Sequence, residues 1–437
     1  MKSPFEIIMI RKGYPLAEMR FKLEEIQRTL GRNSLNGISR NKAILDFHYQ
    51  QNRNYRDFIG DYVPNNWKDL PVITKQNFQT GLDKWLSDDC STKNVFLNST
   101  SGSSGIPLKF AKDRKAHALT WAFIEQRYRI VGINVFRDLE ARFYGIPISP
   151  YSKYLKERVK DFIAKRLRFP VFNLEDDVLE TYYSRFTKSP FVYLNGYTSS
   201  LVAFAEYILR KKQKTLKQIC PSLKVCITTS EMCSSADRKI IEKAFGIKVI
   251  NEYGAAELDI LAIEDAEGDW ILNEESLFIE VVGDDNQPVE NGSEGKIIVT
   301  SLYNKAMPFI RYELGDRGII STRTKGPYRI LKDLTGRTND IAELPSGRKI
   351  PGLTFYYVTK ALLKEEGVIR EIVVKQEASD SFLILYSGAR DLNESEKSNV
   401  RDLLYTYMEP GLKLRIERVE KIIRQPSGKL KQFERLF

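Results

Sequence analysis

The sequence predicts an α/β protein in which a large N-terminal part precedes a small α+β unit. The chain has 437 residues, 42% hydrophobic and 29% charged, so it is long enough for two or three domains with buried cores. From residue 70 to about residue 310, short apolar segments alternate with helical patterns, which is typical of a parallel sheet. Beyond residue 340 the pattern changes to a few strands around one helix. We therefore expect two units, 1–338 and 339–437.

The first 65 residues show mostly helical patterns, with a loop-like Arg- and Asn-rich passage at 31–41. The clearest supersecondary unit comes later, with a strand at 223–230, a helix at 235–245 and a second strand from 248 to 250. Ligands of open α/β sheets bind at the carboxyl ends of the strands. The residues after position 250 are therefore well placed for a binding site.

The pattern then becomes antiparallel. Strand patterns at 278–282 and 295–300 flank a turn-rich segment, which predicts a hairpin. The C-terminal unit is expected to contain strands at 371–375, 382–386 and 412–419 and a helix that starts at Asn393 with a capping box.

Composition favours a cytoplasmic enzyme. No apolar run is as long as a membrane span, and the apolar start of the chain is short and carries an acid, so it is a poor signal peptide. The few cysteines and histidines lack metal-ligand spacing and a nucleophile elbow, so we expect free thiols and no histidine-based hydrolase triad. These residues are Cys90, Cys220, Cys226, Cys233, His48 and His117.

The net charge of +11 is concentrated in places such as 151–168, where a helical pattern has one apolar face. Such a helix either packs its apolar face on the protein core, which we favour because most amphipathic helices do so, or lies on an anionic membrane surface. The second interpretation would make the protein peripheral to the inner face of the membrane. The basic run at 210–212 lacks interleaved aromatic residues, so no nucleic-acid partner is expected.

A segment rich in hydroxyl groups and glycine precedes a helical pattern at 113–131. Such a loop can present backbone N–H groups and hydroxyls to an anion, and the helix N-terminus adds positive potential. A flexible linker has a similar composition, so the loop alone is ambiguous. Its residues are Ser99, Thr100, Ser101, Gly102, Ser103, Ser104 and Gly105.

Further motifs follow in a fixed order. Tyr253, Gly254 and Glu257 offer an aromatic face for a purine, a tight turn and a carboxylate for Mg²⁺. Asp316 follows a Gly and could accept from the hydroxyls of a ribose, and Lys429 lies in a polar tail close to the C-terminal end. Each motif is weak alone, but their order and the small unit around the last ones are specific.

With these motifs in this order, the chain resembles the adenylate-forming superfamily of acyl-CoA synthetases, luciferases and peptide-synthetase adenylation domains. It is most similar to the phenylacetate–CoA ligase branch, which includes capsule-biosynthesis members. The segments 70–75 and 307–312 support this branch, and the resemblance spans about residues 65–437.

The resemblance implies a large adenylate-forming domain, a small mobile domain and a reaction in two halves. A carboxylate attacks the α-phosphate of MgATP, and the acyl-adenylate then passes to the thiol of coenzyme A or to an amine. Lys429, Glu257 and Arg337 are the implied catalytic residues, Glu257 also holds Mg²⁺, and Asp340 is the hinge. The implied nucleotide-binding residues are Ser99, Thr100, Ser101, Gly102, Ser103, Ser104, Gly105, Ser230, Glu231, Asn251, Glu252, Tyr253, Gly254, Asp316, Arg337 and Lys429.

The acid pocket is expected around Tyr144, Gly145 and Tyr197, and a loop at 344–349 could meet coenzyme A. The segment 258–273 has neither Cys nor His, so we expect no structural zinc. Two functional classes stay open. One is a ligase that activates a carboxylic acid, in surface polysaccharide biosynthesis if the capsule resemblance holds. The other is a non-catalytic nucleotide-binding scaffold recruited to a membrane assembly.

Overall fold

The central feature of the fold is a large mixed sheet. The structure is a computed structural model, and it describes residues 2–30, 35–61, 63–100, 108–144, 151–171, 173–337, 341–351, 355, 368–423 and 430–437. The strands of the large sheet are β3 (Glu140–Phe143), β4 (Arg166–Phe169), β5 (Tyr193–Tyr197), β6 (Val225–Thr229), β7 (Lys248–Ala255), β8 (Asp259–Glu264), β9 (Trp270–Leu272), β10 (Leu277–Val282), β11 (Glu294–Ser301), β12 (Tyr312–Lys325) and β13 (Tyr328–Arg337).

The sheet has 11 strands in the order β10-β11-β12-β13-β9-β8-β7-β6-β5-β3-β4. The strands β4, β3, β5, β6 and β7 run parallel to one another. From β7 onward the pairing is antiparallel, through β8, β9, β13, β12, β11 and β10. The predicted parallel region and the predicted hairpin of β10 and β11 are both confirmed, although the antiparallel part begins before residue 310.

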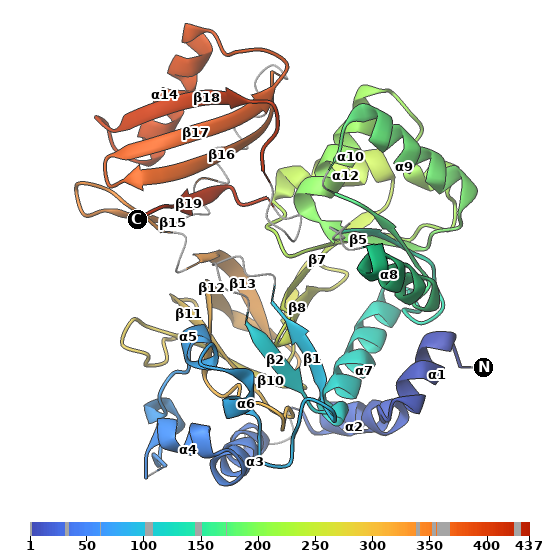
Figure 1. The fold of residues 1–437 in the computed structure, drawn as a ribbon, viewed down its shortest axis with the longest axis vertical. Coiled ribbons are helices and arrows are strands. Elements are labelled where there is room, and N and C mark those ends of the chain that lie inside the picture. The colour runs from blue at the N-terminus through green and yellow to red at the C-terminus, as the bar shows by residue number, and fades with distance from the viewer. Residues whose placement is uncertain are drawn as a thin grey trace.

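Helices cover the parallel part of the sheet and form the N-terminal segment (Figure 1). They are α1 (Pro4–Arg11), α2 (Leu16–Thr29), α3 (Leu35–Gln51), α4 (Arg53–Ile59), α5 (Lys75–Phe78), α6 (Leu82–Trp85), α7 (Arg114–Ile130), α8 (Tyr151–Ile163), α9 (Asp176–Lys188), α10 (Thr198–Arg210), α11 (Leu216–Ile219) and α12 (Ser235–Phe245). The helical character of the first 65 residues is confirmed. The loop predicted at 31–41 is wrong from residue 35 onward, because α3 buries Ile44 and Leu45 in the core.

The predicted strand–helix–strand unit is present as β6, α12 and β7. All five residues of β6 are buried. A capping box of Ser234 and Asp237 starts α12, and Gly246 ends it with a left-handed φ of 70°. Between the strands and the helices, the aromatic residues Phe143, Phe169 and Phe204 belong to one core cluster.

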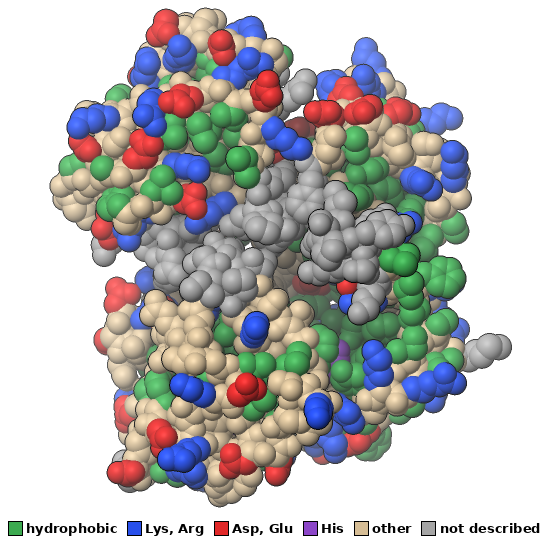
Figure 2. Space-filling model, viewed as in Figure 1, with side chains coloured by type: hydrophobic (Ala, Val, Ile, Leu, Met, Phe, Trp, Pro, Cys, Tyr) green, Lys and Arg blue, Asp and Glu red, His purple; other side chains and the backbone are tan. Residues whose placement is uncertain are grey.

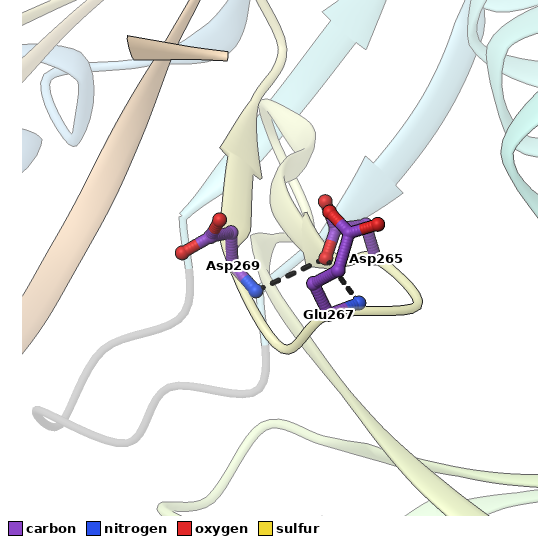
Figure 3. Close-up of side chains that lie close together, drawn as sticks. All are labelled: Asp265, Glu267 and Asp269. Atoms are coloured by element: carbon purple, nitrogen blue, oxygen red, sulfur yellow. Dashed lines mark hydrogen bonds between the residues drawn. The ribbon is translucent and has the colours of Figure 1, made fainter. Parts of the chain in front are cut away.

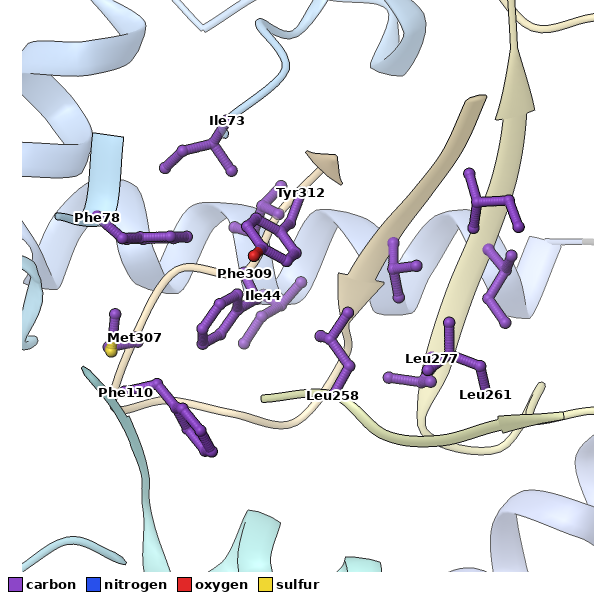
Figure 4. Packing of buried hydrophobic residues seen from close by; sticks show 14 of the residues in the cluster. Ile44, Ile73, Phe78, Phe110, Leu258, Leu261, Leu277, Met307, Phe309 and Tyr312 are labelled. Carbon is purple, nitrogen blue, oxygen red and sulfur yellow. The ribbon is translucent and has the colours of Figure 1, made fainter. Parts of the chain in front are cut away.

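A second core lies under the antiparallel strands. Figure 4 shows Phe78, Phe110, Met307, Phe309 and Tyr312 converging there from segments far apart in the sequence. The short hairpin of β1 (Phe96–Ser99) and β2 (Lys109–Lys112) contributes Phe110 to this core. The hydroxyl-rich loop therefore leaves and returns to a hairpin that is anchored in the core.

The C-terminal part has a sheet and a core of its own (Figure 1, orange to red). The sheet order is β18-β17-β16-β19, and α14 packs its buried Val400 and Leu404 against the same core. The predicted strands and the capping box at Asn393 are confirmed. The elements are β14 (Ile341–Glu343), β15 (Lys349–Pro351), β16 (Ile369–Ala378), β17 (Ser381–Gly388), α14 (Glu394–Tyr407), β18 (Lys413–Val419) and β19 (Phe433–Arg435).

The basic helix predicted at 151–168 differs from its prediction in two respects. It ends at Ile163, and Arg166 and Arg168 belong to β4. Its apolar residues Leu155, Val159 and Phe162 are exposed instead of packed on the core. In the part of the chain that the structure describes, no helix is both long enough and apolar enough to cross a bilayer.

Candidate active site

The carboxyl ends of β5, β6 and β7 meet at one edge of the sheet because the three strands are parallel neighbours. After β6, Ser230 has a positive φ of 67°, which is unusual for a residue with a side chain. The next residue, Glu231, accepts a hydrogen bond at Oε2 from the backbone N–H of Ser199 in the first turn of α10, at 2.7 Å. The carboxylate of Glu231 is thus fixed at the strand edge.

The other carboxylate oxygen of Glu231 contacts the C-terminal part of the chain. Its Oε1 accepts a hydrogen bond from the backbone N–H of Leu430 at 3.2 Å. Leu430 directly follows Lys429, the predicted catalytic lysine, which itself lies outside the described residues. The structure therefore brings the neighbour of Lys429 to the strand ends where the predicted nucleotide residues lie.

Two predicted nucleotide residues are joined directly. The hydroxyl of Tyr253 donates to Oδ2 of Asp316 at 2.8 Å. On the adjacent strand, Arg337 is the register partner of Asp316, which places the backbone of the predicted ribose and phosphate residues side by side. The Tyr253 ring is stacked near Trp270, with ring centroids 6.3 Å apart.

The close pairing of β7 and β8 explains why position 254 is a glycine. A Cβ atom at this position would lie 2.5 Å from the backbone oxygen of Asp259. This distance is shorter than any normal contact of a Cβ atom. Only glycine fits here without a shift of the backbone. The Tyr-Gly pair of the motif thus has a packing reason as well as a chemical one.

Glu257, the predicted metal ligand, is a buried carboxylate. Only 7% of the residue is exposed, and the Tyr312 hydroxyl donates to its Oε1 at 3.0 Å. Burial raises the pKa of Glu257, and the Tyr312 hydrogen bond and the charges of Lys112 and Lys75 oppose this shift. A buried carboxylate among cations and hydrogen-bond donors is suited to a hard divalent cation.

The start of the hydroxyl-rich loop is held by two hydrogen bonds between Thr100 and Leu108. The backbone N–H of Thr100 donates to the Leu108 oxygen at 2.9 Å, and the Leu108 N–H donates to the Thr100 hydroxyl at 2.9 Å. Ser99 is the last residue of β1 and pairs with Lys109. The other predicted loop residues lie outside the described residues, namely Ser101, Gly102, Ser103, Ser104 and Gly105.

A cleft of about 400 Å³ lies between the segment after β6 and strand β13. It is lined by the segment 232–235 after β6, by Asn251 and Trp270, and by the segment 331–334 of β13. Asn251 is held by the Thr228 hydroxyl and by a hydrogen bond from its own backbone N–H to Glu264 at 2.7 Å. Of the predicted nucleotide residues, Asn251 therefore reaches a cleft of a size that suits a small ligand.

Two predicted acid-pocket residues lie together, since the rings of Tyr144 and Tyr197 are 4.5 Å apart. Gly145 and the predicted hinge Asp340 lie outside the described residues. Glu252, predicted with the nucleotide residues, lines a separate cavity next to Tyr144. In the predicted coenzyme A loop, Arg348 donates to the backbone oxygens of Met408 and Tyr407 at the C-terminus of α14, where a cation is favourable.

An acidic group formed by Asp265, Glu267 and Asp269 lies in the turn between β8 and β9 (Figure 3). The backbone N–H groups of Glu267 and Asp269 donate to Asp265 at 2.9 and 3.1 Å. Lys325 pairs with Asp265 and Glu267. Turn geometry and ion pairs account for this cluster.

Sequence reasoning missed the groups that support the predicted residues. Trp270 beside Tyr253 and Lys112 beside Glu257 come from other strands, so no local spacing announces them. Tyr312 lies in the segment 307–312 that supports the resemblance, and this membership was the one available signal for it.

Comparisons with known proteins show what the chain as a whole is similar to. No family model matches the chain. Protein CapK of Staphylococcus aureus is 24% identical over 380 residues, which cover 83% of this chain and 79% of CapK. The phenylacetate-coenzyme A ligase of Thermus thermophilus is 26% identical over 180 residues, so the match spans 37% of this chain and only 40% of that ligase.

The fold agrees with a solved structure of 2-hydroxyisobutyryl-CoA ligase in the postadenylation state in complex with R3-HIB-AMP. The TM-score is 0.69 at 16% sequence identity, over 93% of this chain and 91% of the ligase. The chain is thus similar to CapK along most of its length and to a phenylacetate-coenzyme A ligase over a shorter segment, and it has the fold of a solved CoA ligase.

Proposed function

We propose that this protein activates a carboxylic acid with ATP, releases pyrophosphate and transfers the acyl group from the adenylate to coenzyme A or an amine. The hydrogen bond between Glu231 and Leu430 is the observation that carries the proposal. It sets the C-terminal segment against the end of β6, and the neighbouring strand β7 contains Tyr253. A protein that only bound a nucleotide would have no need for this contact between its two parts.

Each residue then has a physical task. Tyr253 offers its ring to adenine, and its hydroxyl orients Asp316 toward the ribose hydroxyls. Thr100 and the loop after it would hold the phosphates that leave as pyrophosphate. Lys429 would neutralise the charge that gathers when the acyl carboxylate approaches the α-phosphate, which is the usual task of a preorganised cation.

Glu257 is the residue that fits Mg²⁺. Its carboxylate is buried, one oxygen is oriented by Tyr312 at 3.0 Å, and the oxygen chemistry is that of a magnesium ligand. When bound, the metal would neutralise charge on the phosphates. The Tyr312 hydroxyl would hold the Glu257 carboxylate in one orientation and would favour its ionised form.

Relatives support coenzyme A as the acceptor, because the phenylacetate-coenzyme A ligase of Thermus thermophilus is 26% identical to part of the chain. The loop at 344–349 is a less direct support than expected, since Arg348 is engaged by α14. A role in surface polysaccharide biosynthesis, which the resemblance to capsule-biosynthesis members implies, stays a prediction.

The test is carboxylate-dependent exchange of labelled pyrophosphate into ATP. We expect exchange with the wild-type protein and a decrease of about 10²–10³-fold in Lys429→Ala, the scale of one preorganised electrostatic group. Lys431→Ala, two residues away in the same segment, is the matched control and should keep exchange within a few-fold. Intact ATP binding without exchange over a broad panel of acids would instead favour the nucleotide-binding scaffold.

A further inference from the structure

A polar cavity lies beside the strand ends that carry the nucleotide residues. Its volume is about 130 Å³, and it lies between α7 and the strands β3, β5 and β7. Tyr144, a predicted acid-pocket residue, and Glu252, which directly precedes Tyr253, both line it. A cavity of about 150 Å³ in an apolar core is large enough for benzene. This cavity therefore has room for a ring or a short chain.

The lining of the cavity is not that of an apolar pocket. Glu252 accepts hydrogen bonds from the hydroxyls of Tyr128 at 2.8 Å and Thr229 at 3.3 Å, which are both neutral donors. Glu140 faces Arg142, with Oε1 and Nε 3.5 Å apart. Carboxylates in the interior are rare unless a partner compensates them.

Asn195 is the most informative residue of the cavity. The residue is 4% exposed, and its Oδ1 is buried without a hydrogen-bond partner among the residues that the structure describes. Its Nδ2 faces the Tyr128 oxygen at 3.5 Å, and the proton of that hydroxyl is donated to Glu252. The carbonyl of Asn195 is therefore an acceptor that lacks a donor, which is a costly state for a buried amide.

We propose that the acid activated by this protein carries a hydroxyl or amino group at its far end, which donates to Asn195 Oδ1 and Glu252. This inference rests on the proposed function and adds the substrate class to it. An acid of the same size with only alkyl or aryl groups would leave Asn195 Oδ1 without a donor and would offer Glu252 none beyond Tyr128 and Thr229. The site should reject it, because sites built around hydrogen bonds discriminate strongly against analogues that lack them.

The test is pyrophosphate exchange with matched acids. Phenylacetate is compared with its para-hydroxy and para-amino derivatives, and butyrate with its terminal hydroxy and amino derivatives. We expect at least one derivative to exceed its parent by about 10²-fold or more in kcat/KM. The comparison of hydroxy with amino derivatives shows which donor the cavity takes.

Variants connect the preference to the cavity. Asn195→Leu keeps the branching and the number of heavy atoms of the side chain but removes the acceptor, so the preference should fall by about tenfold or more. Ile260→Val changes a lining residue without changing polarity, and it should keep the preference. If Asn195→Leu does not fold, the kcat/KM ratios of each derivative to its parent acid, measured with the wild-type protein, decide the proposal. Exchange that is as good or better with the apolar parents overturns this proposal and leaves the proposed function intact, whereas no exchange with any acid overturns the proposed function itself.

The helix α8 has its polar face turned toward the protein. Arg168 donates to Asp161 at 2.9 Å and to Glu157 at 2.7 Å, so the next strand holds the acidic face of the helix. Asp161 is buried, at 3% exposure. Amphipathic helices of globular proteins usually have the opposite orientation.

The apolar face of α8 consequently points away from the protein. Leu155, Val159 and Phe162 are 54%, 53% and 83% exposed, and their spacing of four and three residues puts them on one stripe. Arg158, Lys160 and Lys165 are also exposed on this segment. In Figure 2, hydrophobic side chains reach the surface in the region where Figure 1 draws α8.

We infer that α8 lies on an anionic lipid surface, with Leu155, Val159 and Phe162 inserted at the level of the headgroups. The exposed basic residues and the net charge of +11 are complementary to anionic lipid. The competing occupant of this face is a second copy of the chain. A second copy would carry the same positive charges, which disfavours it.

The test is cosedimentation of the whole protein with vesicles of phosphatidylcholine, with or without phosphatidylglycerol. Binding should be at least about tenfold stronger to the anionic vesicles and should weaken in high salt. The variant L155S/V159S/F162S should lose this binding. Phe21→Ser, which changes an exposed residue of α2, should keep it.

Two results would overturn the inference. One is vesicle binding that is absent, or equal in the wild-type protein and the triple variant. The other is sedimentation equilibrium that shows a wild-type dimer which the triple variant converts to a monomer, because this result assigns the face to a second copy. All three substituted side chains are exposed, so the fold should tolerate the changes.

Discussion

Tyr312→Phe tests the assignment of Glu257 most directly. The substitution keeps the ring, which packs with Phe78 and Phe309 in the core, and removes the hydroxyl that donates to Glu257 Oε1 at 3.0 Å. Burial already raises the pKa of Glu257, and this hydrogen bond is one of the contacts that lower it. Without the hydroxyl, the pKa of Glu257 should rise further.

The expected size follows from the type of contact. A hydrogen bond to a charged group contributes about 1.5–3 kcal/mol, and one pKa unit corresponds to about 1.4 kcal/mol, so the pKa should rise by roughly 1–2 units. The carboxylate is then protonated at a higher pH. Because a metal ligand must be ionised, the acid limb of pyrophosphate exchange should move toward higher pH by the same amount.

The assay is the pH profile of exchange at several Mg²⁺ concentrations. Tyr386→Phe is the matched control, since its hydroxyl accepts from Leu392 within the C-terminal core, and it should leave the acid limb in place. Excess Mg²⁺ should partly restore Tyr312→Phe at low pH because the metal competes with the proton. An acid limb and a Mg²⁺ dependence that are both unchanged in Tyr312→Phe would refute Glu257 as the metal ligand.

Three further predictions concern other parts of the chain. Burial lowers the pKa of His48 from 6.5 to about 4. As the pH falls below 6.5, His48 takes up a proton in the unfolded chain but not in the folded protein, so about 3 kcal/mol of stability should be lost by pH 4. Urea unfolding at several pH values should show a weaker pH dependence in His48→Gln. Arg311 is 1% exposed and donates to the backbone oxygens of Lys68, Leu70 and Asn286, so Arg311→Met should cost about 3–5 kcal/mol in urea unfolding by leaving the buried Glu280 without its ion pair. The double variant with Glu280→Gln should recover part of this loss, and no recovery would show that the backbone contacts dominate. Tyr253→Phe should raise the KM for ATP about tenfold through loss of the bond to Asp316; an unchanged KM would show that Asp316 needs no such orientation.

The sequence was sufficient for the order of elements and for the residues that follow strand ends. Tyr253 and Asp316 are 63 positions apart, yet they are joined by a hydrogen bond, because β7 and β12, the strands that contain them, belong to the same sheet. The alternation of strands and helices predicted the parallel region, and antiparallel pairing began earlier because β7 continues directly into a tight pair with β8.

The cavity and the orientation of α8 could not be predicted in this way. Asn195 and Glu252 lie on different strands and face the cavity only because β5, β6 and β7 are in register. The periodicity of α8 shows an apolar stripe but not the direction in which it points. That direction is decided by ion pairs from Asp161 and Glu157 to Arg168, a residue of the following strand.

The contact between Glu231 and Leu430 also has the strength that a movable C-terminal unit would need. One backbone N–H that donates to a carboxylate contributes about 1.5–3 kcal/mol, enough to favour one arrangement by roughly ten- to a hundredfold while still allowing release in each turnover. The second oxygen of Glu231 remains bound to Ser199 at 2.7 Å. The carboxylate would therefore keep its orientation after Leu430 has left, and the same arrangement could form again without reordering the strand edge.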